Sequence, residues 1–407
     1  MKIAVIGGGS TYTPELVSGL ATLPLDELVL MDPDAERLRI VGGLASRMLP
    51  GRVRLTAELD EAVEGAFAVL LQLRVGGQRA RHADETWPLE CGCVGQETTG
   101  AGGLAKAMRT VPVVLRIAER VRALAPQAWV VDFTNPVGIV TRALLQEGHL
   151  AVGLCNVAIG FQRLLARLYG CAPGELALGH VGLNHLSWER SAVVDGVDVL
   201  PELLDRHGAA LAEETELPVE LIRSARVLPS YYLRYYYTHD RVVAEQRGRP
   251  TRAQEVMALE EQLLGMYPTL DDKPDLLEQR GGAHYSTAAA DLLASLAADR
   301  GDTQVVNVRN DGTLPFLPDS AVIEAPARIT AAGAVPLPAD PVPPAQSGLI
   351  AHVSAYEELA LEAALHGGRA RVEAALLAHP LVGQYDLARD LADRLLAANR
   401  GFLGEAS

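Results

Sequence analysis

The stretch that decides the fold is Ile3-Ala4-Val5-Ile6-Gly7-Gly8-Gly9-Ser10-Thr11-Tyr12. Its first four residues are all apolar, which predicts a strand buried on both faces. The glycines allow a backbone to approach a pyrophosphate closely, and the N-terminus of a helix after them would attract that anion. Strand, glycine loop and helix together predict a dinucleotide-binding loop formed by Gly7, Gly8, Gly9, Ser10 and Thr11.

Two residues bear on the kind of dinucleotide. Asp32 ends the second predicted strand, 23 residues after Gly9, where a carboxylate binds the ribose hydroxyls of NAD and repels the extra phosphate of NADP. Tyr12 stands where the third glycine of the usual pattern would be, so the pattern is incomplete. The alternative interpretation is an ordinary glycine turn, with Asp32 as the cap of the next helix.

Working outward, residues 1–155 alternate strand-like and helix-like segments. Apolar runs predict further strands at Leu28–Met31, Ala68–Leu71 and Trp129–Val131, and three- and four-residue spacing predicts helices over Asp34–Met48 and Gly103–Leu124. This alternation predicts an α/β fold in which crossover helices connect the strands of a doubly wound parallel sheet. Ligands of such sheets bind at the carboxyl ends of the strands.

After Gly153 the pattern changes and helical segments dominate. Helices are predicted over Ile159–Tyr169, Ala253–Leu264, Ala288–Ala298 and Ser354–Ala378, and a strand over Val305–Val308. The stretch 326–346 holds six prolines and is predicted to be extended or loop. We therefore expect a Rossmann-type domain at 1–155 and a single α+β domain at 156–407.

The composition excludes several classes of function. The formal net charge is −15, with 36 basic against 51 acidic residues, which disfavours binding to nucleic acid or anionic membranes. No apolar run approaches the length of a transmembrane span, and the opening residues do not resemble a signal peptide. Four cysteines in 407 residues do not form a disulfide scaffold. We expect a cytoplasmic protein.

A thiol and an imidazole are candidate metal ligands. Cys155 follows a short apolar run, and His185 lies 30 residues further on. Such a pair can bind a divalent transition metal and leave open positions for substrate oxygens. The spacing is equally compatible with a buried cysteine and a hydrogen-bonded histidine. Cys91 and Cys93 lack a second pair, so we do not predict a metal site there.

Five tyrosines fall within residues 231–237. On a helix Tyr232, Tyr235 and Tyr236 would share a face. Aromatic packing is one interpretation. The other is that one phenol accepts a proton, which requires nearby positive charge to lower its pKa.

Four arginines are candidate anion ligands: Arg74, Arg81, Arg252 and Arg280. A guanidinium can bind a phosphate through two hydrogen bonds. The alternative for each is a solvated surface side chain.

Six motifs stand in order along nearly the whole chain: Met1–Glu15, Gly95–Gly100, Phe133–Pro136, Cys155–Val157, Gly182–His185 and Tyr232–Tyr236. Together they resemble glycoside hydrolase family 4, and within it the 6-phospho-β-glucosidases. The resemblance implies a lactate/malate dehydrogenase-like architecture, NAD as cofactor and a divalent metal, usually Mn²⁺. Tyr12 belongs to the opening motif of that family.

The resemblance also implies roles for individual residues. Cys155 and His185 would be the metal ligands, and Tyr232 would be the catalytic base. Asp32 and the glycine loop would hold NAD.

The phosphosugar would contact Arg81, Asn135, Asn156 and Arg252. Asparagine at position 156 is typical of β-specific members, since the α-specific members have aspartate there. Ala158 departs from the family, which usually has proline at that position.

The implied reaction is hydrolysis without net redox change. Hydride passes from C3 of the sugar to NAD⁺, the ketone acidifies the C2 proton, and Tyr232 removes it. The aglycone leaves from C1, water adds, and the earlier steps reverse. The substrates would be small phosphorylated disaccharides or β-glucosides, and the protein a homodimer or homotetramer.

Three alternatives remain at this point. One is an α-glycosidase of the same family. Another is a plain NAD-dependent 2-hydroxy-acid dehydrogenase, which would accumulate NADH. The third is a sensor that binds NAD or a sugar phosphate without turnover.

Overall fold

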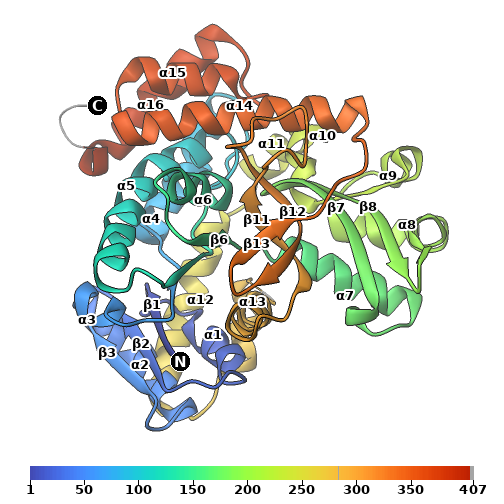
Figure 1. Cartoon of the computed structure of the whole chain (residues 1–407). Helices are drawn as coiled ribbons and strands as arrows, with labels where there is room; N and C mark the ends of the chain where they lie inside the picture. The colour runs from blue at the N-terminus through green and yellow to red at the C-terminus, as the bar shows by residue number, and fades with distance from the viewer. Residues whose placement is uncertain (283, 404–407) are drawn as a thin grey trace.

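The computed structural model describes residues 1–282 and 284–403, and within them one mixed sheet of 13 strands (Figure 1). Its first part is parallel, in the order β3-β2-β1-β4-β5-β6, which is the strand order of the doubly wound dinucleotide-binding fold. The strands are β1 (Lys2–Ile6), β2 (Glu27–Met31), β3 (Val53–Thr56), β4 (Ala68–Leu71), β5 (Trp129–Asp132) and β6 (Ala151–Gly153). The predicted parallel sheet is confirmed.

Helices cover both faces of this parallel part. They are α1 (Thr13–Leu20), α2 (Ala35–Met48), α3 (Leu59–Val63), α4 (Gly77–Glu90), α5 (Gly100–Leu124) and α6 (Val137–Gln146). Ile3 and Val5 belong to the core on one face, whereas Ala4 and Ile6 belong to the core on the other. Successive strand residues point to opposite faces, so an uninterrupted apolar run is what a central strand with two covered faces requires.

The sheet continues beyond β6 with antiparallel strands in the order β11-β12-β7-β8-β10, to which β9 and β13 are attached. These strands are β7 (Leu176–Leu183), β8 (Leu186–Val194), β9 (Val197–Asp198), β10 (Leu228–Pro229), β11 (Asp302–Arg309), β12 (Val322–Thr330) and β13 (Gly333–Pro336). Hydrogen bonding therefore passes from β6 to β11 without interruption. The division at residue 155 stays a proposal about folding units within this sheet.

The second half of the chain contributes a further set of helices. They are α7 (Val157–Tyr169), α8 (Leu200–Thr215), α9 (Val219–Ala225), α10 (Arg234–Tyr237), α11 (His239–Arg247), α12 (Arg252–Met266), α13 (Tyr285–Ala298), α14 (Pro344–His366), α15 (Arg369–Ala378) and α16 (Tyr385–Leu403). Helix α12 packs against α4, and α13 packs against α1 and β12. Figure 1 shows α14, α15 and α16 together over α5. In the described residues no helix has the length and apolar character that crossing a membrane needs.

One helix prediction was wrong. Ser354–Ala378 was expected to be one helix, but α14 ends at His366 and α15 begins at Arg369. Gly367 and Gly368 between them adopt φ values of 59° and 89°, a left-handed backbone that glycine reaches without steric cost. The proline-rich stretch behaves as expected up to residue 343, because it continues β12 to Thr330, forms β13 and then runs as loop until α14 begins at Pro344.

Candidate active site

The glycine loop packs against the ends of its neighbouring strands. A Cβ on Gly7 would lie 2.7 Å from the Gln72 carbonyl oxygen, and one on Gly9 would lie 2.9 Å from the Asp32 carboxylate. The Gly9 N–H donates to Asp32 over 2.9 Å. Helix α2 is capped by Asp34, whose carboxylate accepts from the Arg37 N–H. Asp32 is therefore not the helix cap that the alternative interpretation required.

Tyr12 connects the loop to the second half of the chain. Its hydroxyl donates to the Gly282 carbonyl over 2.7 Å, and its ring lies against Gly282, where a Cβ would come within 2.9 Å. The Tyr267 hydroxyl, just after α12, donates to the Thr11 carbonyl over 2.6 Å. The residue that breaks the usual glycine pattern thus anchors this loop to the segment before α13.

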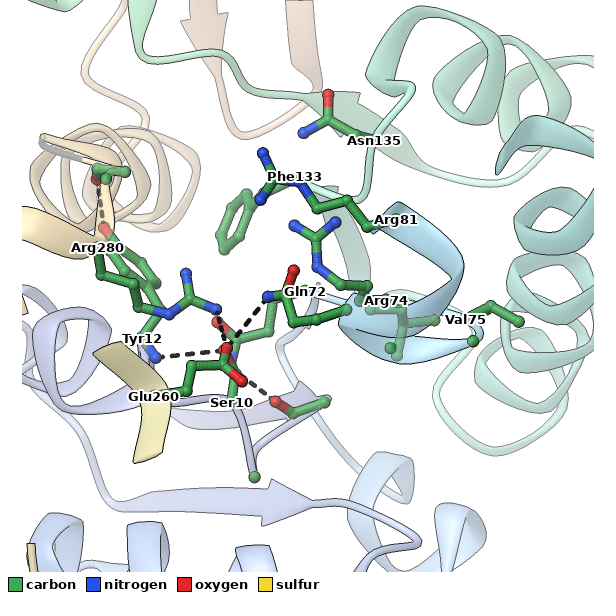
Figure 2. Close-up of a pocket in the computed structure, with 18 of the residues that line it drawn as sticks. Ser10, Tyr12, Gln72, Arg74, Val75, Arg81, Phe133, Asn135, Glu260 and Arg280 are labelled. Atoms are coloured by element: carbon green, nitrogen blue, oxygen red, sulfur yellow. Dashed lines mark hydrogen bonds and ion pairs between the residues drawn. The ribbon is translucent and has the colours of Figure 1, made fainter. Parts of the chain in front are cut away.

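A cavity of about 830 Å³ opens in front of the glycine loop (Figure 2). The predicted site residues that line it are Gly7, Gly9, Ser10, Asp32, Arg81, Asn135, Asn156, Tyr232 and Arg252. Gly8 instead packs against Leu30, and the Thr11 hydroxyl is bonded to Glu260 and Arg280. The structure therefore brings most of the predicted residues, from seven separate segments, to one place.

Cys155 and His185 are both neighbours of Tyr232. The rings of His185 and Tyr232 are stacked, with centroids 3.5 Å apart and planes 8° from parallel. Cys155 is buried and hydrogen-bonded to the side chains of Tyr285 and Asn184, and Asn184 is the residue before His185. Two residues 30 positions apart thus both lie near Tyr232, and Asn184 connects them. Neither is among the described residues that line the cavity.

Burial governs the protonation of this group. It raises the pKa of the Cys155 thiol and of the Tyr232 phenol, and it lowers the pKa of His185 to about 4. Arg81 acts in the opposite direction on Tyr232 by lowering its pKa. The neutral imidazole is the form that binds a metal, whereas the thiol and the phenol need added positive charge in order to ionise.

The hydrogen bonds of the Gly95–Gly100 motif fix the tautomer of His185. The Gln96 side-chain oxygen accepts from the Thr99 N–H over 3.0 Å and from the Thr98 hydroxyl over 2.8 Å. The single Thr98 hydroxyl proton is thereby used, so its oxygen accepts from Nδ1–H of His185 over 2.9 Å. Nε2 then keeps its lone pair, and this arrangement fits a metal-binding histidine.

A divalent cation held here would have few protein ligands. Within residues 1–282 and 284–403, no group of three or more His, Cys, Asp or Glu side chains is placed to hold a metal ion. The thiol and imidazole suit a transition metal that completes its coordination with water or substrate oxygens. The donor set thus fits the predicted metal, with positions left for a substrate.

One wall of the cavity carries several cations around a single buried carboxylate, Glu97. It forms ion pairs with Arg74 and Lys106, and with Arg81 over 3.2 Å. Burial alone would raise the pKa of Glu97, but these three partners hold that pKa well below its usual value. Burial lowers the pKa of Lys106 to about 7. Arg81 is also paired with Glu85 over 2.7 Å. The wall thus holds three basic and two acidic side chains, and it carries excess positive charge, which suits an anionic ligand, when Lys106 is protonated.

A second carboxylate, Glu260 on α12, organises the other wall, as Figure 2 shows. It accepts hydrogen bonds from the side chains of Thr11, Gln78, Arg37 and Arg280, over 3.1 to 3.3 Å. Burial would raise the pKa of Glu260, but Arg280 and Arg37 hold that pKa below its usual value. Sequence reasoning gave no role to Glu97 or Glu260, because a lone glutamate carries no spacing signal before the fold brings its partners to it.

The four candidate arginines all line the cavity, although the Arg252 side chain is 44% exposed. The other tyrosines of the cluster behave as packing residues: Tyr231 meets Tyr232 and Tyr235 edge-on, with centroids 5.7 and 6.1 Å apart. Two acceptors on the cavity wall, Asn135 Oδ1 and Gln72 Oε1, are buried without a hydrogen-bond partner. Such atoms favour a bound ligand that donates to them.

A dinucleotide loop that faces a cationic cavity is the arrangement of an enzyme that uses a nucleotide cofactor on an anionic substrate. Comparison with known proteins specifies the class. Residues 2–171 match the model of the family 4 glycosyl hydrolases, and residues 180–382 match the model of their C-terminal domain. The chain belongs to family 4 of the glycosyl hydrolases.

Its relatives include enzymes of one activity from two bacteria. The 6-phospho-β-glucosidase of Thermotoga maritima is 36% identical over 99% of both chains, and that of Escherichia coli is 35% identical over 99% of this chain and 96% of the relative. A phospho-α-glucosidase of Clostridium acetobutylicum is 28% identical over 99% of both chains. The β-specific relatives named here are therefore more similar to this chain than the α-specific one.

The structural comparisons agree with this. The Thermotoga maritima structure with manganese, NAD⁺ and glucose 6-phosphate has a TM-score of 0.93 over 99% of both chains, at 36% identity. Malate dehydrogenase from Plasmodium falciparum has a TM-score of 0.56 at 14% identity, over 90% of this chain and 98% of the dehydrogenase. The second likeness concerns the fold alone, and it confirms the predicted dehydrogenase-like architecture.

Proposed function

We propose that this enzyme hydrolyses 6-phospho-β-glucosides to glucose 6-phosphate and an alcohol or sugar, and that it uses NAD and a divalent metal, Mn²⁺ in the first place. The observation that carries the proposal is the single cavity in which the glycine loop, the cationic wall and Tyr232 meet, with Cys155 and His185 as neighbours of Tyr232. The relatives named for this activity at 35–36% identity support it.

The cofactors supply chemistry that the side chains lack. When bound, NAD⁺ accepts a hydride from C3 of the sugar, and a divalent cation at Cys155 and His185 polarises the sugar oxygens and lowers the pKa of nearby phenols. Tyr232, which lines the cavity, takes the proton from C2 and later returns it. Asp32 and the glycine backbone would hold the dinucleotide in place throughout the reaction.

Other residues hold the sugar. Asn135 Oδ1, which is buried and has no partner, accepts a hydrogen bond from a sugar hydroxyl. Arg81 and Arg252 bind the 6-phosphate or orient the ring beside it. Asn156 lines the same cavity, and because a carboxamide cannot protonate a leaving group, this residue supports the β-specific assignment over the α-specific one.

The test is release of nitrophenol from p-nitrophenyl 6-phospho-β-glucoside, measured with and without NAD⁺ and with either Mn²⁺ or EDTA, under reducing conditions. We expect release that needs both cofactors and leaves no net NADH. The α-anomer and the unphosphorylated β-glucoside serve as comparisons. Faster release from the α-anomer would overturn the anomeric assignment, and steady accumulation of NADH would favour the dehydrogenase alternative.

Arg252 offers a test of phosphate recognition. It begins α12 and lines the cavity, and its guanidinium is held by Glu255 over 2.9 Å and by the Gln279 carbonyl over 2.8 Å. Arg252→Gln should raise KM for the phosphorylated substrate by about 10- to 100-fold, the loss expected for one charge-assisted hydrogen bond, with kcat nearly unchanged.

The matched control is Arg249→Gln, three residues away on the exposed loop before α12. It should leave both constants unchanged. An equal rise in KM for an unphosphorylated glucoside in Arg252→Gln would show that this side chain does not recognise the phosphate.

We also propose a cytoplasmic location and a homodimer or homotetramer. All four cysteines are free thiols, and a thiolate metal ligand at Cys155 works best in a reducing compartment. The oligomeric state follows from the resemblance to the family and is measured directly by sedimentation.

A further inference from the structure

A buried carboxylate, Glu324 on β12, lies at the centre of a polar cluster behind the proposed metal ligands. Its Oε2 accepts hydrogen bonds from the side-chain amides of Asn184 and Asn307, each over 3.2 Å. Its Oε1 lies 3.0 Å from Nε2 of His180. The side chain is 1% exposed, so water cannot replace any of these partners.

The sheet places Glu324 between the two strands that lead to the proposed metal ligands. Strands β11 and β12 separate β6, which ends just before Cys155, from β7, which ends just before Asn184. Gly153, Asn307, Glu324 and Gly182 form one row across these four strands, each paired with the next. The row therefore sets how far apart the ends of β6 and β7 stand.

Asn184 links Glu324 to the two proposed ligands, Cys155 and His185. Its amide donates to Glu324, and its side chain also hydrogen-bonds the Cys155 thiol. The next residue, His185, has a φ of 62°, a left-handed conformation that is costly for a residue with a Cβ and persists only where the surroundings enforce it. The Asn184–Glu324 contact is part of that enforcement.

The cluster also carries excess negative charge. His180 is enclosed by Glu324 and by Glu189, whose Oε1 lies 2.7 Å from Nδ1. Against the effect of burial, these carboxylates raise the pKa of His180 to about 10, so the ring is an imidazolium at neutral pH. One imidazolium balances only one of two carboxylates, and the remaining negative charge favours a cation nearby.

We propose that Glu324 is a positioning residue for the divalent cation. Through Asn184 it holds the turn that presents His185 beside Cys155, and its charge stabilises the bound cation. The inference rests on the proposed function, since it presumes a metal at these two residues. Both effects act in the same direction, and removal of such an outer partner costs metal affinity about 10- to 100-fold in other metal sites.

The experiment compares wild type with Glu324→Gln, which keeps the shape and one acceptor oxygen but loses the charge. Mn²⁺ binding is titrated by electron paramagnetic resonance of the free ion, with NAD present, and NAD binding is titrated separately by calorimetry. We expect the Mn²⁺ dissociation constant to rise by at least tenfold, while that of NAD stays within twofold. The control is Glu362→Gln on α14, an exposed glutamate that should change neither constant.

A second variant, Asn184→Ala, keeps the charge of Glu324 and removes only the side chain that connects Glu324 to Cys155. It therefore tests the positioning role even if Glu324→Gln does not fold. It too should weaken Mn²⁺ binding by about tenfold. Unchanged Mn²⁺ affinity in the folded variants would overturn the role of Glu324. Failure of the wild type to bind Mn²⁺ would instead overturn the metal in the proposed function, so the two failures are distinguishable.

Discussion

Replacement of Cys155 by serine should lower kcat by at least about a thousandfold, because a cation that polarises the reacting oxygens is worth several kcal/mol of barrier. The serine hydroxyl stays protonated at neutral pH and is a poor ligand compared with a thiolate. The change removes one of two proposed protein ligands from a site in which no third is placed among the described residues. The measurement is turnover of the phosphorylated β-glucoside at saturating NAD⁺ and Mn²⁺.

Cys171→Ser is the matched control, since Cys171 lies just after α7 and is also a free thiol. It should retain full activity. NAD affinity, measured in both variants, reports whether the glycine loop and the sheet remain intact. Activity close to that of the wild type in Cys155→Ser would remove Cys155 from the site.

Replacement of Tyr232 by phenylalanine should lower kcat by about 10² to 10⁴, the range that one positioned proton acceptor contributes. The substitution removes only the hydroxyl, so the ring can keep its stacking on His185 and its contact with Tyr231. NAD and Mn²⁺ should therefore bind as they do to the wild type, and the loss should fall on kcat. Steady-state kinetics together with cofactor titrations separate these effects.

Tyr237→Phe provides the comparison within the same aromatic segment, because Tyr237 is partly exposed at 39%. It should be nearly silent. If Tyr232→Phe turned over at the rate of the wild type, the proton acceptor would be another group, and the stacking of Tyr232 on His185 would be only structural.

The sequence predicted the parts of the fold that depend on local pattern. The apolar run Ile3–Ile6 requires two covered faces, and the glycines after it require close packing, so the central strand and its loop followed directly. Predicted helices such as Ile159–Tyr169 and Ala253–Leu264 lie within α7 and α12, because their apolar spacing matches the face that they bury. The break at Gly367 and Gly368 was missed, since apolar spacing continues on both sides of it.

The candidate site was predictable to the extent that motifs mark it. Nine of the thirteen predicted site residues line one cavity, and Cys155 and His185 lie near Tyr232, which is one of the nine. The supporting carboxylates Glu97, Glu260 and Glu324 were not predictable. Their roles depend on hydrogen-bond and ion-pair partners that become neighbours only in the folded chain. Glu260 bonds Thr11 from 249 residues away, and Glu324 bonds Asn184 from 140 residues away. Such contacts depend on strand order and register, which local sequence does not specify.

The central claim is that the glycosidic bond breaks through removal of the C2 proton and not through direct displacement at C1. The most direct measurement is hydrolysis of p-nitrophenyl 6-phospho-β-glucoside in D₂O, followed by nuclear magnetic resonance of the glucose 6-phosphate formed. Tyr232 borders the cavity, so its phenolic proton exchanges with solvent, and the account predicts deuterium at C2 of the product. A product that keeps its original hydrogen at C2 would contradict the account.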